Sequence, residues 1–321
     1  MALTATSHDW NTPFEARDIE FVGTRVLTIG NGSTGAGNMG VAVWDRSTSS
    51  GRLWLTDVAE TSCACLVVGS KLCTTTRYGY SSQNGLYVWD FSDWDNPTCT
   101  KIGAPRHSGF GASDGSYLCT WRGVVNLSTL SYGTVSSFID TGYNWYASGG
   151  VGYACLNNTT SLYLVNLSTR SVSSTVTLPR TIMTTPHPQR TITFFDGKLW
   201  FATNDSVPTM MTYRLADGDT QVFTVSTPGG SIPGSGVYYG NKITGVMLVG
   251  PDDLFYMIQA ARADYGSDYW YYLAALQGVF DPATSSWWTE SFAATPANQL
   301  NPRFNGSKLW TVTGPSSPAW P

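Results

Sequence analysis

Histidine and carboxylate side chains are the groups in this 321-residue chain that could perform catalysis. Activation of a serine or cysteine nucleophile needs a nearby base, and the chain contains only His8, His107 and His187. No His-Glu-x-x-His motif accompanies them. Paired carboxylates can hydrolyse glycosidic bonds, but the aspartate pairs of this sequence fall mostly in predicted turns. The sequence therefore predicts a protein that is not an enzyme.

The six cysteines raise the question of a disulfide framework or a metal site. Cys73, Cys119 and Cys155 occupy equivalent places in a repeated pattern where other copies carry leucine, tryptophan or phenylalanine. Free cysteine packs as a small hydrophobic residue, so these three are predicted to lie in the core. Cys63 and Cys65 alternate on one predicted strand, yet no Cys-x-x-Cys motif or histidine pair accompanies them. We expect free thiols, no metal ligands and no cofactor.

A short pattern repeats along the whole chain, in which a turn with glycine or aspartate precedes an apolar strand. One position of the pattern recurs seven times, every 36 to 55 residues. That position is occupied by Leu27, Cys73, Cys119, Cys155, Trp200, Phe255 and Trp310. In the first six copies a further apolar strand follows and ends in aspartate or asparagine, whose side chain can bond the backbone two residues on and close a turn. Each unit is predicted to hold four short strands.

Four-stranded units at this spacing are typical of β-propeller blades, which must stack on neighbours to bury both faces. We predict an all-β fold, a seven-bladed β-propeller over residues 17–314. Six or eight blades stay open, because the fourth and sixth copies depart most from the average spacing. The seventh unit runs out after Trp310, so residues 1–16 are expected to complete it and close the ring, leaving 315–321 as a tail.

The repeat also assigns charged residues to the two ends of the predicted ring. Connections from the second to the third strand, and from the fourth strand to the next unit, emerge at one end, called here the loop end. The remaining turns emerge at the opposite end, called here the turn end. The turn end receives Asp45, Asp93, Asp95, Asp114, Asp196, Asp217, Asp219, Asp252, Asp253 and Asp281. Turns prefer aspartate for local reasons, which explains much of this distribution.

Arginine and histidine are assigned mainly to the loop end. The residues predicted to bind a partner there are Arg77, Arg106, His107, Arg122, Arg190 and Arg262, with Arg180 and His187 on the same end. Turn chemistry does not explain this distribution, and arginine is enriched in binding surfaces. The loop end is therefore predicted to dock on an acidic or polar partner.

The longest predicted loops emerge at the loop end, and the one over residues 262–272 combines two carboxylates with five aromatic rings. Aromatic rings can stack on sugars while acids bond the hydroxyl groups, so an alternative carbohydrate-binding site consists of Asp264, Tyr265, Asp268 and Trp270. A bound Ca²⁺ near the two aspartates stays open. In a purely structural interpretation, Trp270 and Tyr272 simply begin the third strand of the unit.

Composition excludes several classes of function. The net charge of −4 and the pI near 5.3 argue against a nucleic-acid-binding protein, which would need a basic excess. No run reaches the roughly 18 apolar residues needed to cross a membrane. The first ten residues lack the basic and hydrophobic regions of a signal peptide, so synthesis in a cytoplasm is expected. Charged residues make up 12% of the chain, which is low for an intracellular scaffold.

Three segments resemble known propeller repeats. Residues 280–287 are similar to the strand-turn-strand part of a kelch repeat, and Val-Trp-Asp at 43–45 and 88–90 resembles the end of a WD40 repeat. The paired glycines of kelch repeats and the Gly-His dipeptide of WD40 repeats are missing. The resemblance therefore implies the architecture and assigns no functional residues.

The composition resembles that of bacteriophage virion proteins, with little charge, abundant glycine, serine and threonine, and only four glutamates and five lysines. This resemblance implies a non-enzymatic virion component in a tail nozzle, hub, fibre or capsid-attached position. Its expected partners are other virion proteins or itself, without nucleic acid and without membrane insertion. The alternative is a carbohydrate-binding propeller lectin or a receptor-binding adhesin that recognises a host-surface glycan.

Overall fold

The predicted turns after the third strands are present, and their hydrogen bonds explain where those strands end. In the computed structural model, an aspartate or asparagine oxygen accepts the backbone N–H two residues on in six turns, at 2.8 to 3.1 Å. Five of these residues end their strand, and Asp217 lies three residues beyond the strand that ends at Arg214. The accepting residues are Asp45, Asp90, Asn126, Asn166, Asp217 and Asp281. This local bond replaces the next rung of the β-ladder, so the chain reverses there.

The structure describes residues 14–32, 38–56, 62–76, 85–103, 110–120, 122–138, 143–156, 159–182, 192–203, 209–224, 230–231, 238–239, 245–265, 268–288, 299–306 and 308–313. Within these ranges every element is a β-strand, as the sequence predicts for an all-β fold. A helix capable of crossing a membrane is not found among them.

Five antiparallel sheets have four strands each, connected in chain order. The first sheet consists of β1 (Phe14–Val22), β2 (Arg25–Gly32), β3 (Met39–Asp45) and β4 (Ser50–Leu55). The second consists of β5 (Ser62–Val68), β6 (Lys71–Thr76), β7 (Leu86–Asp90) and β8 (Thr98–Ile102). The third consists of β9 (Phe110–Ser113), β10 (Tyr117–Thr120), β11 (Gly123–Asn126) and β12 (Ser131–Thr134). The fourth consists of β13 (Asn144–Ser148), β14 (Val151–Cys155), β15 (Ser161–Asn166) and β16 (Ser171–Thr177). The fifth consists of β17 (Ile192–Phe195), β18 (Lys198–Ala202), β19 (Thr209–Arg214) and β20 (Thr220–Thr224).

The last sheet departs from this plan because it combines two repeat copies. Its strands are β23 (Gly245–Val249), β24 (Phe255–Tyr265), β25 (Asp268–Asp281), β26 (Ser286–Trp288), β27 (Gln299–Asn305) and β28 (Lys308–Thr313). The hairpin β27–β28 joins β25 through the pair Leu273↔Gln299, while β26 pairs with the far end of β25. A separate two-stranded sheet is formed by β21 (Gly230–Ser231) and β22 (Tyr238–Tyr239).

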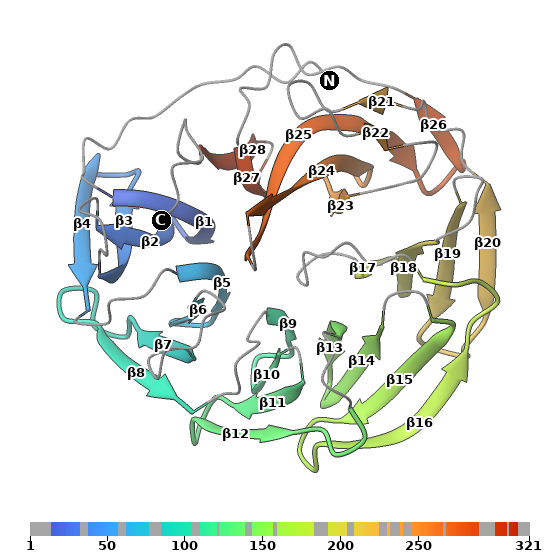
Figure 1. The fold of residues 1–321 in the computed structure, drawn as a ribbon, viewed down its shortest axis with the longest axis horizontal. Coiled ribbons are helices and arrows are strands. Elements are labelled where there is room, and N and C mark those ends of the chain that lie inside the picture. Colours follow the sequence, from blue (N-terminus) through green and yellow to red (C-terminus); the bar gives the residue numbers. More distant parts are fainter. Residues whose placement is uncertain are drawn as a thin grey trace.

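Figure 1 shows the sheets arranged around a common centre, with the first strand of each sheet nearest the centre and the fourth at the rim. This arrangement is propeller-like. Each sheet stands beside the next along the chain, so the second to fifth sheets have both faces covered by neighbours. Several four-stranded antiparallel sheets without any described helix confirm the all-β repeat architecture that the sequence predicts.

Alternation along the second strand of each sheet builds the cores on both of its faces. On β6, Leu72 packs with the first sheet and Cys73 packs with the third. On β10, Leu118 and Cys119 divide in the same way between the second and fourth sheets. Successive strand residues point to opposite faces, so two adjacent apolar residues supply two different inter-sheet cores.

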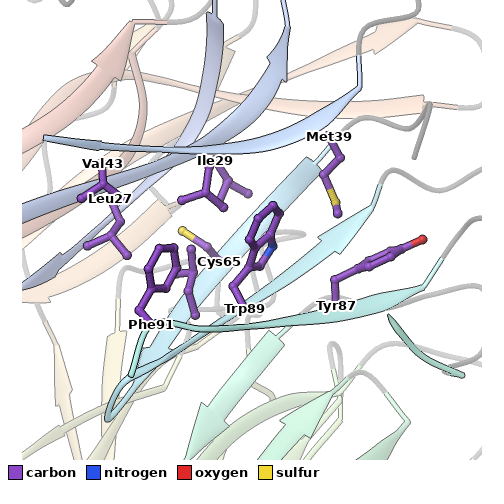
Figure 2. Packing of buried hydrophobic residues seen from close by; sticks show 10 residues of the cluster. Leu27, Ile29, Met39, Val43, Cys65, Tyr87, Trp89 and Phe91 are labelled. Carbon is purple, nitrogen blue, oxygen red and sulfur yellow. The ribbon is translucent and has the colours of Figure 1, made fainter. Parts of the chain in front are cut away.

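The core between the first two sheets shows how tightly these faces fit (Figure 2). Leu27, Ile29 and Val43 from the first sheet meet Trp89 and Phe91 from the second, and each of these side chains is at most 6% exposed. The Trp89 indole N–H donates to the Thr74 hydroxyl at 3.2 Å, so its only polar atom is satisfied inside the core.

The seven repeat-column residues all lie on the strand that follows the glycine or aspartate turn. They occupy the third position of that strand in five copies, but Cys155 is the fifth residue of β14 and Phe255 is the first of β24. The first five side chains pack against the next sheet along the chain, whereas Phe255 packs against Trp200 of the sheet before it. Cys73, Cys119 and Cys155 are each 0% exposed, which confirms their predicted role in core packing.

The ends of the chain bear on the predicted closure. Residues 14–16 belong to β1, where they pair with β2 in the first sheet. Residues 1–13 and the predicted tail 315–321 lie outside the described residues. Residues 14–16, which the sequence pattern assigns to the closing segment, therefore belong to the first sheet.

Ser49, in the turn between β3 and β4, adopts a backbone conformation that suits glycine. Ser49 has φ 53°, and Leu130, Arg170 and Ser285 at the equivalent turn position have φ between 53° and 56°. We expect Ser49→Gly to raise the free energy of unfolding by about 0.5–1 kcal/mol, because glycine adopts this region without a Cβ clash. Denaturant unfolding measures the change. Ser50→Gly, inside β4, is the control and should lower stability; equal effects of both substitutions would contradict the explanation.

Candidate functional site

The residues predicted to bind a partner through the loop end are only partly within the described structure. Arg122 lies in the short connection between β10 and β11, at the loop end as expected. Arg262 lies on β24. The other four predicted residues, Arg77, Arg106, His107 and Arg190, lie outside the described residues.

Arginine is not confined to the loop end. Five described arginines lie at or beside the turns of the opposite end: Arg25, Arg46, Arg52, Arg170 and Arg214. Most of them contact carboxylates or rings at that end, so part of its negative charge is neutralised. The distribution of arginine alone therefore does not select the loop end as the docking surface.

Ion pairs hold four aspartates of the turn end, Asp45, Asp95, Asp217 and Asp219. Arg214 contacts Asp217 at 3.0 Å and Asp219 at 3.1 Å, and Arg52 bonds Asp95 of the neighbouring sheet. Arg25 lies 3.7 Å from Asp45, and its guanidinium group stacks on Trp94 at 4.2 Å. Bonds to Ser47 hold the pKa of the Asp45 carboxyl below its usual range. The Arg52–Asp95 pair and the contact of Arg25 with Trp94 link turns of the first and second sheets.

Asp90 makes the turn end sensitive to acid. Its carboxylate accepts a 2.6 Å bond from the Lys71 ammonium group and one from the Ser92 N–H, which lower its pKa from 3.8 to about 2. A carboxyl whose pKa is depressed by folding adds stability above the unfolded pKa and loses it as pH falls through the folded value. We expect unfolding experiments to show this loss between about pH 4 and pH 2. Asp90→Asn should flatten that slope, and an unchanged slope would contradict the assignment.

The segment predicted as a loop over residues 262–272 is instead the end of a long β-hairpin. β24 and β25 pair continuously to Tyr265↔Asp268, across a connection that comprises only residues 266 and 267. The structural interpretation of the sequence, in which Trp270 and Tyr272 begin the third strand, is correct. The loop prediction was wrong because aspartate and glycine occur both in irregular segments and in single tight turns, and here they mark a single turn.

Two β-bulges bend this hairpin away from its own sheet. The register shifts between Met257 and Ile258, and again between Gln259 and Ala260, so β25 carries two extra residues opposite β24. Bulges bend the strand and increase its twist. Beyond them, β25 reaches β27 and pairs with it at Leu273, and Figure 1 shows β25 running from β26 towards β27 and β28. The hairpin thus belongs to two repeat units.

The hairpin gathers all four residues of the predicted carbohydrate site within its last three rungs. The final pairs are Ala263↔Trp270, Asp264↔Tyr269 and Tyr265↔Asp268. Neighbouring rungs alternate between faces, so positions 265, 268 and 270 belong to one face of the hairpin and position 264 belongs to the other. The structure describes the backbone of this tip and not its side chains.

Arg262 lies on the same hairpin, paired with Tyr271. Alternation places it on the face of Asp264 and Tyr269. The hairpin tip therefore combines one residue of the predicted partner-binding set with all four of the alternative set. Four consecutive aromatic residues, 269–272, run along β25, so each face carries two of them. The tip extends from the connection between second and third strands, which places it at the loop end.

Metal and thiol chemistry find no support in the described part of the chain. No group of three or more histidine, cysteine or acidic side chains is placed there to hold a metal ion. Burial raises the pKa of the Cys73 thiol to about 12 and raises that of Cys155 further, so both stay protonated near neutral pH.

Native thiol labelling tests this assignment. Among the described cysteines only Cys99 is exposed, whereas Cys65, Cys73, Cys119 and Cys155 are buried. In a Cys63→Ser chain, a thiol-specific reagent at neutral pH should modify one cysteine per folded molecule, and mass spectrometry should locate it at Cys99. Rapid modification of any of the other four before unfolding would contradict the packing.

Two features escaped the sequence analysis. Asp18 on β1 is fully buried, and its carboxylate accepts 2.8 Å bonds from the N–H groups of Ile19 and of Cys65 on β5. Phe194 on β17 is 41% exposed and stacks on Tyr146 of β13 at 4.9 Å. Neither belongs to a repeated motif, so no spacing pattern marks them.

Comparison with known proteins supports the fold alone. No protein-family model and no curated protein matches this chain. Many solved structures match its fold, among them the computationally designed Ika8 protein, at 9% sequence identity. The match covers 98% of this chain and 96% of that protein, with a TM-score of 0.53. At this identity the likeness extends to the arrangement of the sheets over the full length and carries no residue roles.

Proposed function

We propose that this chain is a non-enzymatic structural and interaction protein, a component of a bacteriophage virion, that docks on its partners through the loop end. The observation that carries the proposal is the hairpin β24–β25. Its strands of 11 and 14 residues are the longest in the described structure. It is also the largest departure from the repeat, and departures built on a rigid scaffold are where binding residues concentrate.

The aromatic content of the tip fits a docking role. Tyrosine, tryptophan and arginine are enriched at the centres of protein interfaces, and positions 262–271 supply one arginine, one tryptophan and three tyrosines. The virion assignment rests on the composition: little charge, few lysines and glutamates, and abundant glycine, serine and threonine. The partner on this proposal is another virion protein or a second copy of the chain.

The finer architecture that we propose is a closed ring of seven units. Contacts of one kind support it, each running from the turn after a third strand back to the preceding unit. Trp94 lies against Arg25, and Arg170 donates to the Ser131 carbonyl at 3.0 Å. Arg46 of the first sheet stacks in the same sense on Trp310 of β28, at 5.9 Å. The first sheet thus contacts the hairpin β27–β28 in the same way as the second and fourth sheets contact the sheets before them.

Light scattering tests the docking role. In a shortened chain, residues 262–271 are replaced by Asn-Gly, a sequence that favours the two-residue turn of a β-hairpin, so the pair Ala261↔Tyr272 closes the hairpin. We expect the full chain to associate as its concentration rises and the shortened chain to remain monomeric. Matching thermal unfolding of the two chains serves as the control for folding. Equal masses of the two chains at every concentration would contradict a docking role for the tip in self-association.

A carbohydrate-binding protein is the second candidate, favoured by the register of the tip. Tyr265, Asp268 and Trp270 share one face of the hairpin, an arrangement in which a ring can stack on a sugar beside an acid that bonds its hydroxyl groups. A glycan array distinguishes this function from the first. Binding of a defined sugar by the monomer, abolished in Trp270→Ala and retained in Tyr269→Ala on the opposite face, would establish the lectin instead.

A further inference from the structure

A row of aromatic rings, called here the aromatic seam, lies between the fourth and fifth sheets. Phe194 of β17 is 41% exposed, and its ring stacks on Tyr146 of β13 with the centroids 4.9 Å apart and the planes at 13°. The Tyr146 ring lies 6.0 Å from that of Tyr153 on β14. Tyr213 of β19 completes the row, because the pairs Phe194↔Leu199 and Leu199↔Tyr213 place it on the face of Phe194. All four rings lie within two residues of a strand terminus at the turn end.

The strand register shows that the aromatic seam departs from the repeat. Tyr153 is the third residue of β14, and it occupies the position that the other four-stranded sheets fill with Leu27, Cys73, Cys119 and Trp200. Those four side chains are 0 to 2% exposed, whereas Tyr153 is only partly buried. Phe194 pairs with the second residue of the next strand, as Ala147 does in the fourth sheet, yet Ala147 is only 6% exposed. Departures of this kind from the rules of a scaffold are expected at functional sites.

Three phenol hydroxyl groups gather in the aromatic seam. Burial raises the pKa of Tyr153, and the nearby phenols of Tyr213 and Tyr146 raise it further, because the three groups lie within electrostatic reach of one another. The Tyr213 hydroxyl also lies beside the turn after β19, where a Cβ added at Gly218 would come within 3.5 Å of it. In the described part of the chain, no hydrogen bond engages these three hydroxyls. Each can therefore donate one hydrogen bond to a ligand and accept others from it.

The charged groups that border the aromatic seam nearly balance. Arg214, which follows Tyr213, pairs with two aspartates of its own turn at 3.0 and 3.1 Å. Lys198 is the cross-strand partner of Arg214, and exposed Asp196 lies in the adjoining turn. Two positive and three negative charges thus lie along this border. A balanced border favours a neutral polar ligand over a strongly anionic or cationic one.

We propose that the aromatic seam is a binding site for a neutral saccharide. A sugar ring has an apolar face that can stack on the exposed ring of Phe194, and it has hydroxyl groups that can bond the phenols of Tyr146 and Tyr153. A purely apolar occupant, such as a hydrocarbon chain, would cover those phenols and leave them unpaired, which is costly. The inference is independent of the proposed function, because the aromatic seam and the hairpin tip lie at opposite ends of the ring. A chain docked through the loop end would leave this site accessible.

Saturation-transfer NMR on the full chain tests the proposal, with the methyl glycosides of glucose, galactose, mannose and N-acetylglucosamine as probes. We expect at least one of the four to bind. Phe194→Ala removes the stacking surface and should weaken that binding about tenfold. Tyr153→Phe keeps the ring and removes one hydroxyl, so it should weaken binding about three- to tenfold.

Val222→Ala is the matched control. Val222 lies on the same face of the fifth sheet as Phe194 and is 40% exposed, but it belongs to the outer strand β20. Its truncation should leave sugar binding unchanged. Thermal unfolding of each variant checks that it folds, and Tyr153→Phe decides the outcome if Phe194→Ala does not.

Three results would overturn the inference. The first is the absence of binding by all four glycosides, and a chain that still self-associates in that case leaves the proposed function standing. The second is binding that Trp270→Ala abolishes and Phe194→Ala retains, which would assign the sugar to the hairpin tip. The third is an affinity unchanged in Tyr153→Phe, which would show that the phenols do not contact the sugar.

Discussion

Replacement of Trp89 by alanine is expected to lower the free energy of unfolding by about 3–5 kcal/mol, the range for removal of a large aromatic side chain from a core. Trp89 is 2% exposed and packs with Leu27, Val43 and Phe91 between the first two sheets. Its loss leaves a cavity that rigid strands on both sides cannot close. It also leaves the Thr74 hydroxyl without the indole donor.

Chemical denaturation of three variants measures this effect. Trp89→Phe keeps most of the buried area, so it should cost clearly less than Trp89→Ala. Val222→Ala, at a position 40% exposed, should change stability by less than about 1 kcal/mol. A Trp89→Ala chain as stable as the Val222→Ala chain would show that the inter-sheet cores do not hold the ring together.

Removal of the Asp18 carboxylate is expected to have the second largest effect. The side chain is 0% exposed and bridges two sheets, with one oxygen bonded to the Ile19 N–H and the other to the Cys65 N–H. Asp18→Ala deprives both buried amides of this acceptor. Each unsatisfied buried group costs about 1–3 kcal/mol, so we expect a loss of about 2–4 kcal/mol.

Asp18→Asn separates the hydrogen bonds from the volume of the side chain. Asparagine keeps one carbonyl acceptor at nearly the same size, so it should cost less than alanine. Hydrogen exchange at the Cys65 amide provides a local measurement, because that amide should become less protected in Asp18→Ala. Equal losses of stability in the two variants, with an unchanged Cys65 amide, would contradict the bridge.

Local rules made the regular part of this fold predictable. Asp45 and Asn166 end their strands because their side chains accept the backbone N–H two residues on, and that rule needs no tertiary information. The recurring position held by Cys73 or Trp200 identifies a buried face of its strand, because alternation fixes it, but Phe255 packs on the opposite face, against Trp200. These two signals together are enough to predict repeated four-stranded sheets with cores between them.

The hairpin β24–β25 was not predictable by the same rules. Consecutive aromatic residues at 269–272 show no alternation of polar and apolar side chains, so the strand period is hidden. The pair Leu273↔Gln299 depends on two bulges, and bulges leave no reliable mark in a single sequence. Asp18 escaped for a similar reason, since its burial depends on a Cys65 amide supplied by another sheet.

The measurement that tests the docking role most directly is hydrogen exchange on the chain in its assembled and monomeric states. We expect assembly to protect amides at the hairpin tip, over residues 260–273, and to leave the turn end unchanged at positions such as 46–49 and 92–97. Protection confined to the turn end, or exchange that is identical in the two states at the tip, would contradict docking through the loop end.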